Sequence, residues 1–203
     1  MTRPWIRCAA LAVLVGASSV ACGAEKKPAA EPEPEPSVSA SVTPSATPSS
    51  PPTQPRGVAG VTYEILNWEK YAADPAVLAW KQTTEAAGAS MNTRKVLPAL
   101  RQGSTPSMFK LYLGNVQDGW ANEWHVRPVA KILVQSATTG AKKSTLQVCL
   151  WDPSSVFYQK DGSAYDGVKE EWTRQIVGMT VQGTRWRVSS LETPGKCKGV
   201  PPL

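Results

Sequence analysis

Histidine is almost absent from this sequence of 203 residues, in which His125 is the only one. A metal centre built on several histidines is therefore excluded. The sequence also has neither the Gly-Lys-Ser/Thr phosphate loop nor the Gly-x-Gly-x-x-Gly turn of dinucleotide-binding proteins. Neither a cofactor nor a metal site is predicted. The length leaves room for one ordinary domain with tails, which argues against a two-domain enzyme.

The first 21 residues have the organisation of a secretory signal peptide. Arg3 and Arg7 precede an apolar run at residues 8–15, and small residues follow that run. An apolar segment of about 8 to 13 residues is too short to cross a bilayer, which takes about 20 residues. We therefore expect residues 1–21 to be removed during export.

The signal peptide ends in Ser19-Val20-Ala21-Cys22. This pattern resembles the bacterial lipobox, in which the cysteine thiol receives a diacylglycerol before cleavage, although Ser19 stands where leucine is usual. The resemblance implies lipidation of Cys22 and a membrane partner bound through that anchor, on the extracytoplasmic face of the cell membrane. The alternative interpretation is an ordinary signal peptide followed by an incidental cysteine.

Residues 22–56 contain the predicted lipidated cysteine and a linker. The 34 residues from Gly23 to Arg56 hold nine of the 18 prolines, with Glu-Pro alternation at residues 31–36 and a Ser/Thr/Pro-rich stretch at residues 37–53. Almost nothing apolar is available to bury, so this composition predicts disorder. Such a chain reaches roughly 30 Å as a coil and about 105 Å as extended polyproline. We interpret it as a spacer, the alternative being a docking site for a proline-recognising partner.

The cysteines of the sequence divide between the signal peptide, the anchor and the domain. Cys8 leaves with the signal peptide and Cys22 carries lipid, which leaves Cys149 and Cys197 in the folded region. An even pair in an exported chain predicts one disulfide bond. A reactive thiol or a metal-binding pair is the alternative.

The net charge of +6 comes from scattered basic residues. Nucleic acid is not an expected partner outside the membrane. The charge indicates either attraction to an anionic cell wall or lipid surface, or merely a solvated basic face.

Residues 57–203 are predicted to form a single α+β domain that begins with helices. Asp74-Pro75 has the form of a helix start, and an apolar stripe follows it towards residues 88–92. A second helix is expected over residues 93–102, interrupted by Pro98, and a third from Thr105-Pro106 towards Trp120. The preceding residues 63–71 suggest either a lead-in segment or an earlier helical turn.

After Trp124 the sequence pattern predicts strands. Branched and alternating apolar residues occupy residues 129–134, 145–151, 156–158, 171–181 and 185–188, and turn residues separate them. Strands joined by tight turns make an antiparallel meander. We therefore expect the N-terminal helices to pack on a curved antiparallel β-sheet.

Two short motifs carry a family resemblance. The segment from Gly183 to Val188 reads Gly-x-x-Trp-x-Val. The segment Cys149-x-Trp151-Asp152 is followed by a C-terminal cysteine, Cys197. Over residues 60–198 the chain resembles the nuclear-transport-factor-two-like (cystatin-like cone) domains of many actinobacterial lipoproteins. The resemblance implies a half-open cone whose mouth holds an apolar ligand. It does not imply catalysis, because the fold hosts isomerases, dehydratases, transport adaptors and non-enzymes.

Enzymes of that fold place a base and a proton donor inside the cone. The candidate bases are His125, Asp118 and Asp152, and the candidate donors are Tyr112 and Tyr158. No pair stands at a spacing that fixes both members in one pocket. Structural roles at a junction, a helix end and a turn explain the three bases more simply, so no catalytic residue is predicted.

Seven of the eight tryptophans follow the signal peptide. Trp120, Trp124 and Trp151 are candidates for an aromatic binding platform, and Trp120 and Trp124 are the predicted ligand or partner contacts. The alternative is that tryptophans fill the core. The sequence thus favours a lipid-anchored, non-catalytic binding or scaffolding protein, with a cell-wall polymer or another envelope protein as partner. Its alternatives are a lipid-anchored enzyme on a small apolar substrate and an accessory protein of cell-wall synthesis.

Overall fold

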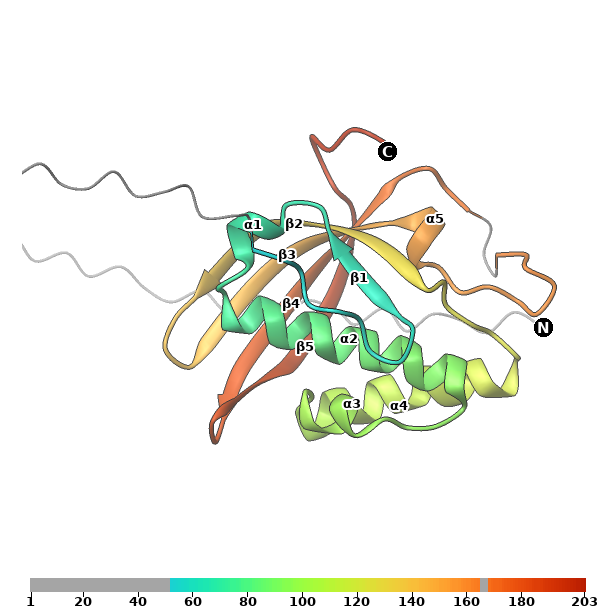
Figure 1. Ribbon diagram of the computed structural model, residues 1–203, viewed down its shortest axis with the longest axis horizontal. Helices are drawn as coiled ribbons and strands as arrows, with labels where there is room; N and C mark the ends of the chain where they lie inside the picture. The colour runs from blue at the N-terminus through green and yellow to red at the C-terminus, as the bar shows by residue number, and fades with distance from the viewer. Residues whose placement is uncertain (1–51, 165–167) are drawn as a thin grey trace, which may run out of the picture. The chain divides into compact units, whose positions relative to one another are not determined.

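The computed structural model describes residues 52–164 and 168–203 (Figure 1). The predicted signal peptide, Cys22 and most of the linker lie outside the described residues. The described chain forms a five-stranded sheet and five helices, which confirms the α+β class. In chain order the elements are β1 (Thr62–Ile65), α1 (Trp68–Tyr71), α2 (Pro75–Thr93), α3 (Pro98–Gln102), α4 (Pro106–Ala121), β2 (Val129–Thr139), β3 (Lys143–Trp151), α5 (Asp152–Ser155), β4 (Trp172–Gln182) and β5 (Arg185–Lys196).

The strands lie in the order β1-β2-β3-β4-β5. Strands β2 to β5 form the predicted antiparallel meander, whereas β1 pairs in parallel with β2, so the sheet is mixed. Strand β1 was not predicted as a strand. Its four residues show too little alternation to mark a strand, and its partners, from Val129 to Ile132, lie far away in the sequence.

The helix starts follow the local signals. Helix α2 begins after Asp74, whose side-chain oxygen accepts hydrogen bonds from the backbone N–H groups of Ala76 and Val77. The second helix is shorter than predicted, because the chain leaves α2 at Arg94 in a left-handed conformation and resumes a helix only at Pro98. Helix α4 begins at Pro106 as predicted.

The strand ends also differ in part from the prediction. Gly183, with φ of +63°, turns the chain between β4 and β5 as expected. Strand β5 continues to Lys196, well beyond the predicted end. Residues 156–158, predicted as a strand, contribute only isolated bridges of Tyr158 with His125 and with Ala164, because the helical turn α5 redirects the chain just before them.

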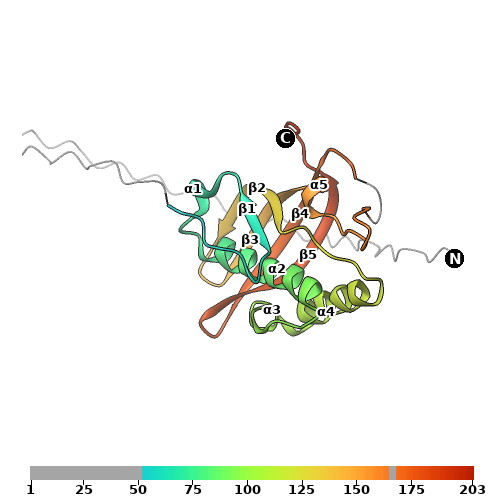
Figure 2. The same cartoon turned by 45° about the vertical axis from the view of Figure 1, so that its right-hand side comes forward.

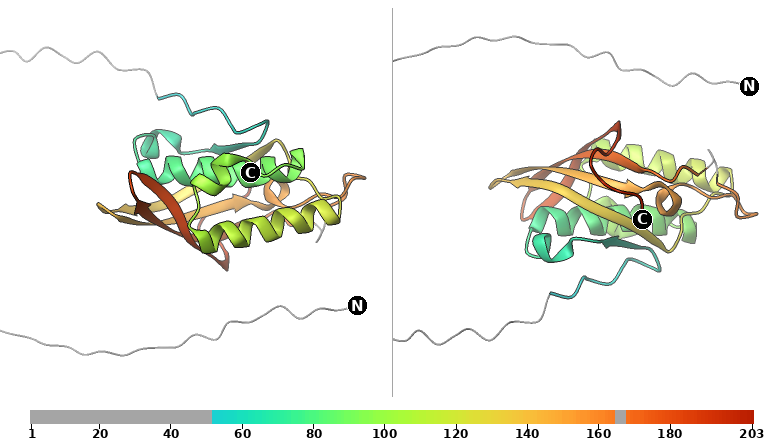
Figure 3. Two further views of the ribbon diagram at one scale, coloured as in Figure 1. Left: turned by 90° about the horizontal axis from the view of Figure 1, so that it is seen from below. Right: turned by 90° about the horizontal axis from the view of Figure 1, so that it is seen from above.

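Helices α2, α3 and α4 lie on one face of the sheet, and α2 crosses the strands obliquely (Figures 1 and 3). Trp80 on α2 is fully buried there. It belongs to a core cluster that also contains Leu100, buried side chains of α1 and α4, and inward residues of the sheet, among them Trp68, Tyr71, Met108, Tyr112, Ile132, Leu146, Val148 and Met179. The side chains of this face thus fill the space between helices and sheet.

The opposite face of the sheet carries a smaller cluster around a disulfide bond between Cys149 and Cys197, as predicted. Trp151 and Trp172 pack beside it, with ring centroids 5.3 Å apart. The Trp172 indole N–H donates a hydrogen bond to the carbonyl of Pro201. The disulfide bond and this hydrogen bond therefore hold the C-terminal segment (Figure 2) on this face.

We expect replacement of Cys149 and Cys197 by alanine to lower the free energy of unfolding by about 2–5 kcal/mol, because the bond closes a long loop in the unfolded chain. Urea denaturation measures the change. A reducing agent should lower the midpoint of the wild-type protein and leave that of the double variant unchanged. An identical wild-type midpoint with and without reductant would contradict this expectation.

Candidate binding cleft

A cleft of about 760 Å³ lies over the outward side of α2. One wall is formed by residues 55–58 of the segment 52–58, here called the strap, and the other wall is formed by α3 with Gly103 and the start of β5. Val58, Leu78, Ala79 and Trp186 line it with apolar surface, and Arg56, Lys81, Gln82, Glu85, Gln102 and Arg185 contribute polar groups. The cleft is distinct from the filled space between helices and sheet.

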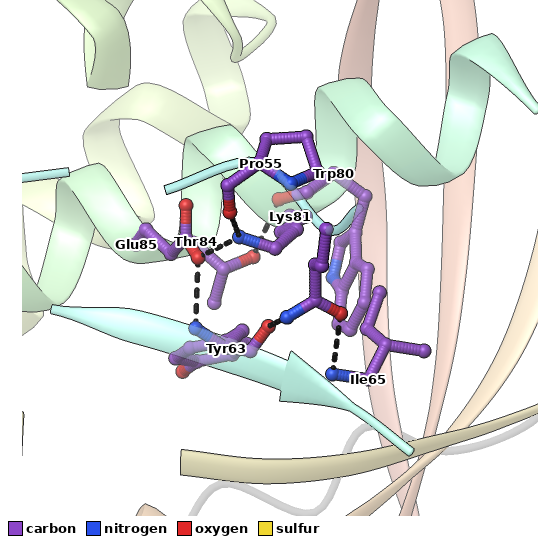
Figure 4. Close-up of polar contacts among 8 residues, drawn as sticks. Pro55, Tyr63, Ile65, Trp80, Lys81, Thr84 and Glu85 are labelled. Atoms are coloured by element: carbon purple, nitrogen blue, oxygen red, sulfur yellow. Dashed lines mark hydrogen bonds and ion pairs between the residues drawn. The ribbon is translucent and has the colours of Figure 1, made fainter. Parts of the chain in front are cut away.

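A buried ion pair forms the base of the strap wall. Lys81 and Glu85 lie one turn apart on α2 and are 2% and 1% exposed. The Lys81 ammonium donates hydrogen bonds to the Glu85 carboxylate and to the carbonyl of Pro55, the latter at 3.2 Å (Figure 4). Glu85 also accepts from the backbone N–H of Tyr63 at 2.7 Å. Through these contacts the pair joins α2 to both β1 and the strap.

Gln54 attaches the strap to the outer edge of β1. Its side-chain N–H donates to the carbonyl of Tyr63 at 3.1 Å, and its side-chain oxygen accepts from the N–H of Ile65 at 2.9 Å. One side-chain amide thereby makes the two bonds that a neighbouring strand would make. Since an open strand edge can pair with another chain, the strap also protects this edge.

Two glycines allow the close approach of backbone at the two walls. A Cβ atom on Gly57 would lie 2.1 Å from the carbonyl oxygen of Val61. On the other wall, a Cβ atom on Gly103 would lie 1.9 Å from the hydroxyl oxygen of Thr83. Any larger residue at either position would push the wall away from the body of the domain.

The second wall is held by hydrogen bonds to β5. The backbone of Val188 donates to Gly103 at 2.8 Å and accepts from Thr105 at 2.9 Å. The Arg185 guanidinium donates to the side-chain oxygen of Gln102 at 2.6 Å. Both walls are therefore anchored to edge strands of the same sheet.

Burial governs the protonation of Glu85, Tyr63 and Tyr112. It raises the pKa of the Glu85 carboxyl, while the Lys81 ammonium and the Tyr63 N–H oppose the rise. Burial also raises the pKa of the Tyr63 phenol, and the negative charges that Tyr112 and Glu85 can carry add to this rise. The pKa of Tyr112 is raised to about 12 by burial, against a weaker hydrogen bond to Thr84.

Neither tryptophan predicted as a contact lines the cleft. Trp120 is half-buried, and its indole N–H donates to the carbonyls of Ser90 and Met91 at the end of α2. Trp124 stacks on Phe157 with ring centroids 5.8 Å apart. Trp151, the third candidate for the platform, packs beside the disulfide bond. A partner contact at Trp120 and Trp124 stays a prediction.

The five residues considered for catalysis lie apart from the cleft. The centroids of the His125 and Tyr158 rings lie 6.0 Å apart, and the Tyr158 hydroxyl donates to the carbonyl of Pro153. The Asp152 carboxylate accepts from the Thr173 hydroxyl, and the Asp118 backbone carbonyl accepts from Asn122. Tyr112 is in the core. Asp152 begins the helical turn α5, and Asp118 lies near the end of α4. These positions match the simpler structural roles expected from the sequence.

Lys81 and Glu85 were not singled out by the sequence analysis. Their spacing of four residues is typical of a helix ion pair, and Lys81 follows Trp80 at the border of the apolar stripe. Spacing alone does not distinguish an exposed pair from a buried one. Their burial results from the strap, which folds back over α2 from a distant position in the sequence.

Neither a metal cluster nor a membrane span is found within residues 52–164 and 168–203. No three His, Cys, Asp or Glu side chains of this part gather at one place that could hold an ion. In the same residues, every helix is too short or too polar to cross a membrane.

No protein-family model matches the chain, and no curated protein is significantly similar to it in sequence. Among solved structures it is similar to a SEC-C motif containing protein from Rhodopseudomonas palustris, with 13% identity and a TM-score of 0.38 over 57% of this chain and 76% of that one. It is also similar to the intermembrane space region of the chloroplast protein ARC6, with 14% identity and a TM-score of 0.39 over 70% of this chain and 100% of that one. The resemblance to nuclear-transport-factor-two-like domains stays a prediction.

Replacing Lys81 by methionine should lower the free energy of unfolding by about 3–5 kcal/mol, because the substitution leaves the Glu85 carboxylate buried without its cation. Chemical denaturation measures the loss. The double variant Lys81→Met with Glu85→Leu should be more stable than Lys81→Met alone, since no buried charge remains. The exposed Lys110 serves as control, and its methionine variant should change stability by less than about 0.5 kcal/mol. Equal losses for the two single methionine variants would contradict the role of the pair.

Alkaline titration should show Tyr112 ionising late. Its pKa rises from 10.0 to about 12 in the folded domain, so the stabilisation is complete below the unfolded value and is lost as pH rises towards the folded value. Phenolate absorbance and circular dichroism, followed together, should show unfolding in this range. In Tyr112→Phe this contribution to the pH dependence should be absent. A variant with the same alkaline profile as the wild type would show that Tyr112 does not contribute.

Proposed function

We propose that this chain is a lipid-anchored protein of the extracytoplasmic membrane face, whose domain is a non-catalytic binding or scaffolding module with the cleft over α2 as its binding site. The predicted signal peptide and lipobox at Cys22 support the location. The disulfide bond between Cys149 and Cys197 supports it independently, because such bonds persist in oxidising compartments.

The observation that carries the binding role is the construction of the cleft. Its volume of about 760 Å³ falls within the range of ligand sites, and its surface combines an apolar floor with a few polar groups. The charged groups buried at its base, Lys81 and Glu85, bond to each other and to the backbone of the strap and β1. Because these bonds hold a wall of the cleft in place, Lys81 and Glu85 suit a structural role in a binding site better than a role in acid-base catalysis.

The position of the strap gives the linker a defined connection to the cleft. Gln54 and Pro55, which the sequence assigns to the end of the linker, bind β1 and α2. The last residues of the predicted tether are therefore also a wall of the candidate site. A module of this kind presents its cleft at a distance from the membrane limited by the linker, about 105 Å when extended as polyproline.

Replacing Cys22 by alanine should abolish acylation of the mature amino terminus. Mass spectrometry of the amino-terminal peptide and partition into a detergent phase measure the result. Cys8→Ala is the matched control, because Cys8 belongs to the predicted signal peptide, and this variant should be acylated normally. An unmodified amino terminus on the wild-type protein, recovered free in the culture fluid, would contradict the anchor.

A further inference from the structure

Two guanidinium groups line opposite walls of the cleft. Arg56 belongs to the strap and Arg185 to the start of β5, and both side chains are exposed. Within the described residues neither forms an ion pair, since the pairs found there are Lys81 with Glu85, Lys160 with Glu123, and Lys196 with Glu171. Glu85, the one acidic residue of the described chain that lines the cleft, is already neutralised by Lys81. The cleft therefore carries two unpaired positive charges.

Two side-chain amides, those of Gln82 and Gln102, also line the cleft. Gln82 is exposed on α2 and has no hydrogen bond to the described part of the chain, and Gln102 uses only its oxygen, for Arg185. An amide side chain both donates and accepts, and so matches the peptide group. The floor contains the aliphatic side chains of Leu78 and Ala79, and Val58 of the strap adjoins it.

We propose that the cleft binds a short acidic peptide segment of a partner protein. Arginine pairs with carboxylates through two parallel hydrogen bonds, so Arg56 and Arg185 each take an acidic side chain. The peptide backbone bonds to the free amides of Gln82 and Gln102, and an apolar side chain of the segment lies on Leu78 and Ala79. The inference rests on the proposed function, because it names the ligand class of the same cleft.

The composition of the lining favours a peptide over a wall glycan. Sugar rings are held chiefly by stacking of their C–H faces on aromatic rings, and among the residues that the structure describes Trp186 is the only aromatic one that lines the cleft. Its remaining apolar lining is aliphatic, which suits the side chains of a peptide. The positive charges of Arg56 and Arg185 then require that peptide to be acidic.

Fluorescence anisotropy with the purified full-length protein tests the proposal. The probes are the fluorescein-labelled peptide Leu-Glu-Val-Glu-Leu, its neutral analogue Leu-Gln-Val-Gln-Leu, and labelled poly(glycerol phosphate) as an anionic polymer. We expect the acidic peptide to bind at least about tenfold more tightly than the neutral one, with an affinity that falls as salt rises.

Three variants locate the binding. Arg56→Gln combined with Arg185→Gln should weaken binding of the acidic peptide by about tenfold or more. Lys142→Gln combined with Lys143→Gln removes the same charge from two exposed positions, the last residue before β3 and the first residue of β3, away from the cleft, and should leave the affinity unchanged. Ala79→Trp fills the floor without changing charge and should abolish binding, and circular dichroism of each variant verifies that it is folded.

The other outcomes overturn the proposal in distinguishable ways. Equal binding of the acidic and neutral peptides, lost in Ala79→Trp, would keep the cleft as a peptide site and reject its acidic specificity. Binding of the polymer alone, dependent on both arginines, would keep the proposed function and replace the ligand class by a phosphate polymer. Absence of peptide and polymer binding at millimolar concentration, or binding insensitive to Ala79→Trp, would reject both the ligand class and the cleft.

Discussion

The architecture of the cleft depends on the buried ion pair between Lys81 and Glu85. Removing two charges from water is costly, and their mutual attraction offsets this cost only when the remaining hydrogen-bonding groups are also satisfied. Here the pair bonds to the carbonyl of Pro55 and to the N–H of Tyr63. These two backbone groups belong to the strap and to β1, so one interaction fixes the strand, the helix and a wall of the cleft together.

In an open sheet the backbone groups of the edge strands are exposed, and in this domain hydrogen bonds from neighbouring segments cover both edges. At β1 the edge is covered by Gln54 and Glu85, and at β5 it is covered by the connection between α3 and α4 through Val188. The strap and Gly103, which take part in covering the two edges, also line the two walls of the cleft. The cleft thus results from the way in which the two edge strands, β1 and β5, are covered.

Local features of the fold were predictable from the sequence, and long-range ones were not. The starts of α2 and α4 and the turn at Gly183 follow from capping, proline and glycine preferences within a few residues. The disulfide bond followed from counting cysteines. Contacts with the strap and with β2 determine strand β1, the burial of Lys81 and the cleft itself. No local sequence pattern predicts those contacts. The residues chosen for aromatic and catalytic roles were those with distinctive chemistry, whereas the cleft uses common glutamine, arginine and aliphatic side chains.

Amide hydrogen exchange at Tyr63 and Ile65, measured by nuclear magnetic resonance in the folded full-length protein, tests most directly whether the strap and the ion pair close the outer edge of β1. Both N–H groups are on the outer edge of β1, and their acceptors are the side chains of Glu85 and Gln54. If the strap and the ion pair close this edge, both amides exchange as slowly as those paired between β2 and β3. Exchange at the rate of a solvent-exposed edge strand would contradict the claim that these side chains hold the strap in place.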